Sequence, residues 1–314
     1  MKVRFGREFP SIVTLIGLLA CLAIAAPAFF TTNNLRDVAL TNVPVLLVAT
    51  GMTLVIIVAE IDVSVGALFA ACSVIAGTSA LFLPMPLVPF IAIAAGVLLG
   101  ALNGALIAWV KAPSIVVTLA TMVAWREALR WSTGGAWIQN LPGNFQWFGL
   151  TQHGGEILIV SCAMAIFFLF LWGMKHLVAL RLVYAIGSDK EAARLAGVSV
   201  KWVTFAVFVV LGALTGMAAM LNAARFSDVP ANSGSKLELM AIAAVIVGGT
   251  PITGGRGSLA GTLVGVALLG SIGPALIFLG VNPSWEKAVQ GVIILAAVVI
   301  DVVRTSHWRR VAPE

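Results

Sequence analysis

Long apolar runs recur along the whole chain, and they constrain its fold more than any other feature. A helix needs about 20 mostly apolar residues to cross a bilayer, and most of the runs are close to that length. Only 10% of the residues are charged and the mean hydropathy is +1.05, a composition that cannot build a water-soluble surface. The sequence therefore predicts an all-α polytopic membrane protein, a single domain over residues 1–314 with about ten transmembrane helices.

The expected spans are separated by short polar or glycine-rich stretches. They lie at residues 11–30, 43–59, 63–83, 88–110, 114–131, 156–174, 202–222, 237–248, 258–279 and 285–303. The run 237–248 is too short to cross comfortably, so the boundaries between 237 and 258 stay open. Residues 31–37 are expected to form a polar turn. Glycines spaced four apart predict close helix packing; they are Gly96, Gly100, Gly212 and Gly216.

The basic residues orient the chain. Lys and Arg are enriched in the cytoplasmic loops of membrane proteins. An even number of spans with both termini inside places most of the basic residues in the cytoplasm. Residues 1–10, 175–201 and 304–314 are then cytoplasmic, and the loop 132–155 is periplasmic. The net charge of +6 is explained by this topology and does not indicate nucleic acid binding.

The most polar stretch is 184–200 (YAIGSDKEAARLAGVSV), within the predicted cytoplasmic loop. Its spacing predicts a helix of about two turns, with Ser188 as N-cap and Glu191 completing a capping box. Gly197 stands where a left-handed residue after the helix is expected. A helix this short needs a surface to lie on.

The same helix offers two kinds of contact. Ala192 and Ala193 are small enough for close approach, while Lys190 and Arg194 can reach acidic groups. Docking on another protein and a capped loop helix without a partner both remain open from this stretch alone.

Two stretches interrupt the apolar runs: 60–66 (EIDVSVG) and 248–257 (GGTPITGGRG). Interrupted helices at comparable places in two halves are typical of inverted repeats around a central pathway, which is our hypothesis here. The second stretch lacks the Gly-Lys-Ser/Thr ending of a phosphate-binding loop, so the chain is not expected to bind ATP by that route.

Polar residues in and near these breaks have two readings. Asp62 is either an ionisable group of a transport pathway or the N-cap of the following helix. The other candidates for the pathway are Ser64, Asn103, Thr118, Thr121 and Thr250. Each of them can instead form a hydrogen bond between helices.

The loop 132–155 carries aromatic residues, among them Trp137, Phe145 and Trp147. They form either a seat for a partner protein or an interfacial aromatic belt. Three scattered cysteines and three distant histidines predict neither a disulfide framework nor a metal site, and we find no converging catalytic set.

Four stretches carry a resemblance to a known family. They are IDVSVGAL (61–68), NGALIAWVKAPSIVVTLATM (103–122), the loop EAARLAG (191–197) and ELMAIAAVIVGGTPITGGRGSLAGTLVG (238–265). In this order they resemble the monosaccharide permeases of ABC importers, a family that includes the ribose, xylose, galactose, rhamnose and autoinducer-2 systems. The loop 133–142 looks closest to the rhamnose and autoinducer-2 members. Glu60 departs from the family pattern, which often has a small residue there.

The resemblance implies a type II ABC importer fold in the bacterial inner membrane. The chain would import a monosaccharide as one of two permease subunits, identical or related, with a periplasmic sugar-binding protein outside. A separate ATPase subunit would bind ATP, so the permease would need no cofactor and would not be an enzyme. The loop would be the coupling helix that docks on the ATPase, through Ser188, Glu191, Ala192, Ala193, Arg194 and Gly197. The alternative is a proton-coupled secondary transporter that uses Asp62 or Glu60.

Overall fold

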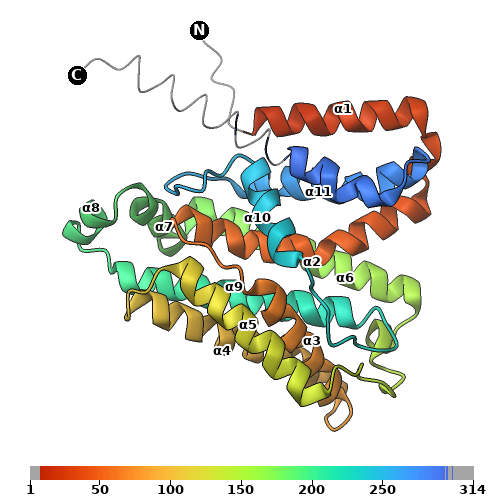
Figure 1. Ribbon diagram of the computed structural model, residues 1–314, viewed down its shortest axis with the longest axis horizontal. Helices are drawn as coiled ribbons and strands as arrows, with labels where there is room; N and C mark the ends of the chain where they lie inside the picture. The colour runs from red at the N-terminus through yellow and green to blue at the C-terminus, as the bar shows by residue number, and fades with distance from the viewer. Residues whose placement is uncertain (1–7, 294, 296–298, 300–314) are drawn as a thin grey trace.

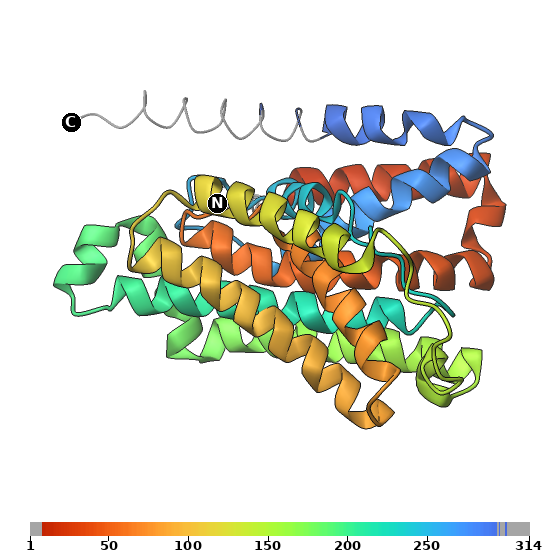
Figure 2. The ribbon, with the colours of Figure 1, turned by 60° about the horizontal axis from the view of Figure 1, so that its bottom comes forward.

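The computed structural model of the protein describes residues 8–293, 295 and 299. Long helices run roughly side by side along one axis (Figure 1), and the turned view shows the same arrangement (Figure 2). At one end of this bundle the short helix α8 (Lys190–Leu195) projects, and we call this the α8 end. The opposite end, which we call the loop end, carries the loops 134–151 and 224–236.

The other helices follow in chain order. They are α1 (Phe9–Ala25), α2 (Thr32–Ile57), α3 (Val65–Ala80), α4 (Val88–Ala108), α5 (Ser114–Thr133), α6 (Gln152–His176), α7 (Val178–Ser188), α9 (Val200–Ala223), α10 (Leu237–Val247) and α11 (Leu259–Phe278). Among the described residues, five helices are long and apolar enough to cross a membrane: α2, Met85–Ala108, α6, α9 and α11. The predicted all-α, polytopic fold class is confirmed. The expected last span, 285–303, lies partly outside the described residues.

Helix α2 forms the centre of the bundle. Its residues from Val43 to Ile57 are all buried, and it packs against α6, α9, α10 and α11. The expected polar turn at 31–37 is wrong, because α2 begins at Thr32. Its first turns are polar but helical, and Arg36 pairs with Glu156 of α6 at 3.1 Å. Hydropathy thus located the start of the apolar part and missed the start of the helix.

Helices α4 and α9 cross at very close range. A Cβ atom on Gly96 would overlap the carbonyl of Gly212, and a Cβ on Gly212 would overlap the carbonyl of Gly96. Gly100 meets the carbonyl of Phe208 in the same way. The predicted glycine-mediated packing is confirmed, and it lets the two backbones touch as in other membrane bundles.

Among the described residues, four apolar helices are shorter than a full span: α1, α3, α7 and α10. Helix α10 has 11 residues, as its short apolar run predicted, and covers about 16 Å, roughly half of a bilayer core. Seven residues, 58–64, separate the end of α2 from the start of α3 at Val65. This first interruption therefore places non-helical backbone inside the bundle. Such backbone occurs at membrane depth only where protein or a water-filled cavity surrounds it.

Candidate functional site

Helix α8 is capped by a different residue from the one expected. The Asp189 carboxylate accepts hydrogen bonds from the backbone N–H groups of Glu191 (2.9 Å) and Ala192 (3.0 Å). Ser188 is the last residue of α7, so the prediction of Ser188 as N-cap is wrong by one residue. Glu191 does not close a capping box; it accepts a hydrogen bond from Arg194 Nε at 2.9 Å, and this contact lowers the pKa of the Glu191 carboxyl.

The two faces of α8 differ. Ala193 is only 5% exposed and faces the protein's own chain, so it presents no surface to a partner in this conformation. Leu195 is 74% exposed, an apolar side chain at the tip of the α8 end. Gly197 has a φ of +84°, which confirms the predicted left-handed residue after the helix. The exposed face thus combines Leu195 with the charged pair Glu191 and Arg194.

An ion pair joins α8 to the first interruption. Lys190 Nζ lies 2.6 Å from Glu60 Oε1, across 130 residues of sequence. Glu60 follows the end of α2 and its side chain is 15% exposed, whereas that of Lys190 is 48% exposed. Glu60 is therefore one half of a contact between the loop helix and the interrupted segment.

The second interruption meets the same place. The Tyr184 hydroxyl donates to the carbonyl of Gly257 at 2.9 Å, and the N–H of Gly255 donates to the carbonyl of Ile57, the last residue of α2, at 2.8 Å. Gly187 of α7 packs so tightly against Ile57 and Gly255 that a side chain there would overlap both. The loop helices and both interruptions thus form one packed unit at the α8 end.

A buried polar cluster surrounds the start of α3. Asp62 is 1% exposed, and its Oδ1 accepts hydrogen bonds from the backbone N–H (2.8 Å) and the hydroxyl (2.6 Å) of Ser64. Asn103 of α4 donates from Nδ2 to Ser64 Oγ at 2.9 Å. Ser64 occupies the N-cap position of α3, so the prediction of Asp62 as the N-cap is wrong by two residues. Asp62 instead forms a side-chain turn that fixes the entry to the helix.

Helix α5 holds the rest of this segment. The N–H of Val63 donates to Thr118 Oγ1 at 3.2 Å, so Thr118 joins the cluster. Thr121 lies one turn further along α5 and bonds back to the Thr118 carbonyl. Thr250 is buried beside Gly257, and no hydrogen bond of the described residues links it to the cluster. Four of the six predicted pathway residues are therefore brought together.

A second polar contact lies close by, and the sequence reading did not find it. Arg126 lies within α5, and its Nη2 is 3.9 Å from Oε2 of Glu238 on α10. Glu238 is 9% exposed and stands against Gly66 of α3. A lone carboxylate that opens a short apolar helix was the signal for it in the sequence.

The aromatic residues of the loop end divide into two kinds. Trp137 is 56% exposed, whereas Phe145 is completely buried among apolar side chains. Trp147 is half-buried against Gly155, and its backbone N–H donates to the Ala224 carbonyl at 2.6 Å. Phe145 thus has no surface for a partner in this conformation, and the expected seat narrows to the two tryptophans.

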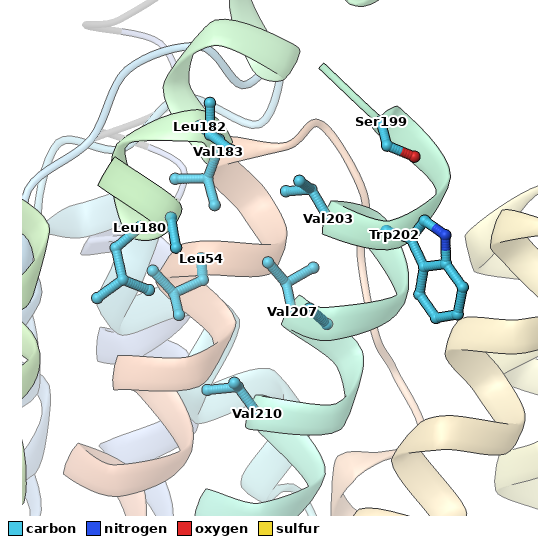
Figure 3. Close-up of a pocket in the computed structure, with 11 residues that line it drawn as sticks. Leu54, Leu180, Leu182, Val183, Ser199, Trp202, Val203, Val207 and Val210 are labelled. Atoms are coloured by element: carbon cyan, nitrogen blue, oxygen red, sulfur yellow. The ribbon is translucent and has the colours of Figure 1, made fainter. Parts of the chain in front are cut away.

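A groove of about 470 Å³ lies between α2, α7 and α9, near the α8 end (Figure 3). Leu54, Leu180, Val203 and Val207 line it, and Figure 3 shows Trp202 at its rim with the ring turned toward the neighbouring helix. That ring packs edge-on against the ring of Trp109, the residue after α4, with the two ring centroids 5.1 Å apart. Because its lining is almost entirely apolar, this groove does not fit a hydroxylated ligand.

These features define a multi-pass, all-helical membrane protein whose interrupted helices converge on one short exposed helix. The chain belongs to the family described as branched-chain amino acid transport system / permease component, whose model matches residues 34–298. It is 35% identical to the ribose import permease protein RbsC of Escherichia coli (strain K12), over 94% of this chain and 93% of that protein. It is 31% identical to the autoinducer 2 import system permease protein LsrC of Enterobacter sp. (strain 638), over 94% of this chain and 87% of that protein. No solved structure matches it.

Proposed function

We propose that this chain is the membrane-spanning permease subunit of an ATP-driven ABC importer for a monosaccharide. One observation carries the proposal: the exposed helix α8 and the adjoining helix α7 contact both interruptions of the spanning helices, α8 through Glu60–Lys190 and α7 through Tyr184–Gly257. Membership of a permease family and relatives named for ribose and autoinducer 2 import support it. A ribose-like or autoinducer-2-like sugar is the proposed substrate class, and rhamnose remains part of the same proposal.

The proposed partners follow from the two ends of the bundle. The α8 end is cytoplasmic and receives the ATPase on Leu195, Glu191 and Arg194. The loop end is periplasmic and receives a sugar-binding protein near Trp137 and Trp147. A second permease subunit completes the pathway, and both termini are cytoplasmic in the bacterial inner membrane.

The proposed mechanism is alternating access. ATP binding closes the ATPase pair and moves α8 together with α7. The segment after Ile57 follows because Glu60 pairs with Lys190 of α8, and the segment before Ser258 follows because Gly257 is bonded to Tyr184 of α7 and Gly255 to Ile57. Movement of the first segment changes the polar cluster of Asp62, Ser64, Asn103 and Thr118, which lines the proposed pathway with Thr121 and Thr250. The partner shifts the equilibrium only by its differential affinity for the two states.

Uptake by membrane vesicles tests the proposal. Vesicles that contain the wild-type permease with its ATPase and binding protein are expected to accumulate labelled sugar when ATP is supplied on the side of the ATPase. An uncoupler is expected to leave this uptake unchanged. Uptake that collapses with the uncoupler while ATP remains would contradict the proposal. It would support the alternative of a proton-coupled transporter that uses Asp62 or Glu60.

Charge reversal tests the link between α8 and the first interruption. Lys190→Glu is expected to lower ATP-driven uptake by about threefold or more, because it places a second carboxylate beside Glu60, while folding stability changes little for so exposed a side chain. The double variant Glu60→Lys with Lys190→Glu is expected to restore most of the uptake. If the double variant loses as much uptake as Glu60→Lys and Lys190→Glu do together when made singly, the ion pair has no part in coupling.

A further inference from the structure

The first turns of α3 and α10 meet in the middle of the bundle. Gly66, the second residue of α3, lies against the carbonyl of Gly234 and the carboxylate of Glu238, and a Cβ atom on Gly66 would overlap both. Measured along the helices, this contact lies about 21 Å from the end of α3 and about 14 Å from the end of α10. Because neither length reaches the roughly 30 Å of a hydrocarbon core, we place the contact near half depth.

Arg126 lies at a similar level on α5, about 18 Å from the start of that helix. Its Nη2 is 3.9 Å from Glu238 Oε2, too far for a hydrogen bond, and its side chain is 30% exposed. A cation at this depth is costly in contact with lipid, so such residues face a bundle interior or a water-filled cavity. This part of α5 therefore borders an aqueous or protein-lined space.

Two buried acceptors flank the first turn of α3. Glu238 Oε2 and Asn103 Oδ1 accept no hydrogen bond from the described residues, although Glu238 is 9% exposed and Asn103 is fully buried. An unmet buried acceptor costs about 1–3 kcal/mol, and most buried polar atoms of native proteins have a partner. What these two atoms lack is a hydrogen-bond donor.

We propose that Glu238, Asn103 and Arg126 form a binding station for the hydroxyl groups of a neutral monosaccharide at half depth of the pathway. This proposal rests on the proposed function. The chain buries both acceptors in this conformation, so the station forms when the pathway opens beside the first turn of α3. Sugar hydroxyls then donate to the two unmet acceptors, and the Arg126 guanidinium donates to a ring or hydroxyl oxygen. The carboxylates of Glu238 and Asp62 repel an anionic ligand. An apolar ligand would leave the buried polar atoms of the station without hydrogen bonds, which costs free energy.

The test uses the complete complex of permease, ATPase and binding protein in lipid vesicles. Uptake of a mixture of labelled autoinducer 2, D-ribose, D-xylose, D-galactose and L-rhamnose is measured together with ATP hydrolysis in the same vesicles. The variants are Glu238→Gln and Arg126→Gln. Their matched controls are Glu127→Gln and Arg130→Gln, which pair with each other on the exposed outer part of α5 at 3.5 Å.

We expect Glu238→Gln and Arg126→Gln each to reduce the sugar taken up per ATP hydrolysed by about tenfold, the factor for one hydrogen bond to a charged group. ATP hydrolysis stays near the wild-type rate and both controls behave as wild type. A merely structural role would lower uptake and ATP hydrolysis together, or the amount of folded complex. If either folded variant takes up as much sugar per ATP hydrolysed as the wild type, the proposed binding station is contradicted. Wild-type vesicles that take up no sugar with ATP would instead contradict the proposed function.

Discussion

Replacing Leu195 by aspartate is expected to abolish ATP-driven uptake while the permease still folds and inserts. Leu195, the last residue of α8, is 74% exposed, so its replacement is expected to disturb few contacts within the chain. On the proposed interface with the ATPase, however, a charge would replace the apolar anchor. Such anchors are worth 2 kcal/mol or more, which corresponds to a loss of at least about tenfold. The measurement is vesicle uptake, with size-exclusion chromatography in detergent as the check on folding.

Leu195→Met is the matched control, because it keeps an apolar side chain of similar volume, and it is expected to retain uptake. If the folded Leu195→Asp variant takes up sugar as the wild type does, α8 does not form the interface with the ATPase. Leu195→Asp separates loss of docking from loss of folding better than Ala193→Glu would. Ala193 is 5% exposed, so a glutamate there would disturb the seat of α8 on its own chain before it met any partner.

Replacing Gly212 by leucine is expected to prevent normal assembly of the bundle. The Gly212 Cα faces the backbone of Gly96 and Gly100, with no room for a Cβ atom. Backbone cannot give way as a flexible side chain can, so α4 and α9 must separate. We expect a loss of more than about 3 kcal/mol, or roughly 10 °C in melting temperature for a chain of this size.

Gly17→Leu is the control for this substitution. Gly17 lies in α1, and a Cβ atom built there would meet nothing within 4 Å. The melting temperature in detergent, followed by tryptophan fluorescence, should therefore fall for Gly212→Leu and stay unchanged for Gly17→Leu. Equal melting temperatures for the two variants would show that the close α4–α9 packing does not support the fold.

Much of the fold could be predicted because hydropathy and glycine spacing are local signals. The apolar runs located the spanning helices, and the run 237–248 was recognised as too short for a full span. Helix ends were less predictable. Polar residues such as Asn34 and Arg36 extend α2 beyond its apolar part, and only contacts with other elements stabilise them there.

The candidate site was predicted only in part, for the same reason. Four of the six candidate pathway residues, Asp62, Ser64, Asn103 and Thr118, lie together around the start of α3, although Asp62 had been assigned to a capping position that Ser64 holds. The pairs Glu60–Lys190 and Arg126–Glu238 join residues more than 100 positions apart. No spacing within one sequence records such a contact, so only the folded chain reveals that α8 and the interruptions are connected.

Site-directed cross-linking tests the central claim most directly, namely that force from an ATPase enters the permease through α8. The native cysteines Cys21, Cys72 and Cys162 are first replaced. A single cysteine is then introduced at position 195 or, as control, at position 137, where Trp137 is exposed at the loop end. If α8 docks on the ATPase, the cysteine at position 195 forms an adduct with the ATPase whose yield changes when ATP is added, and the cysteine at position 137 forms none. An ATPase adduct from position 137, or none from position 195 in a complex that still imports sugar with ATP, would contradict this claim.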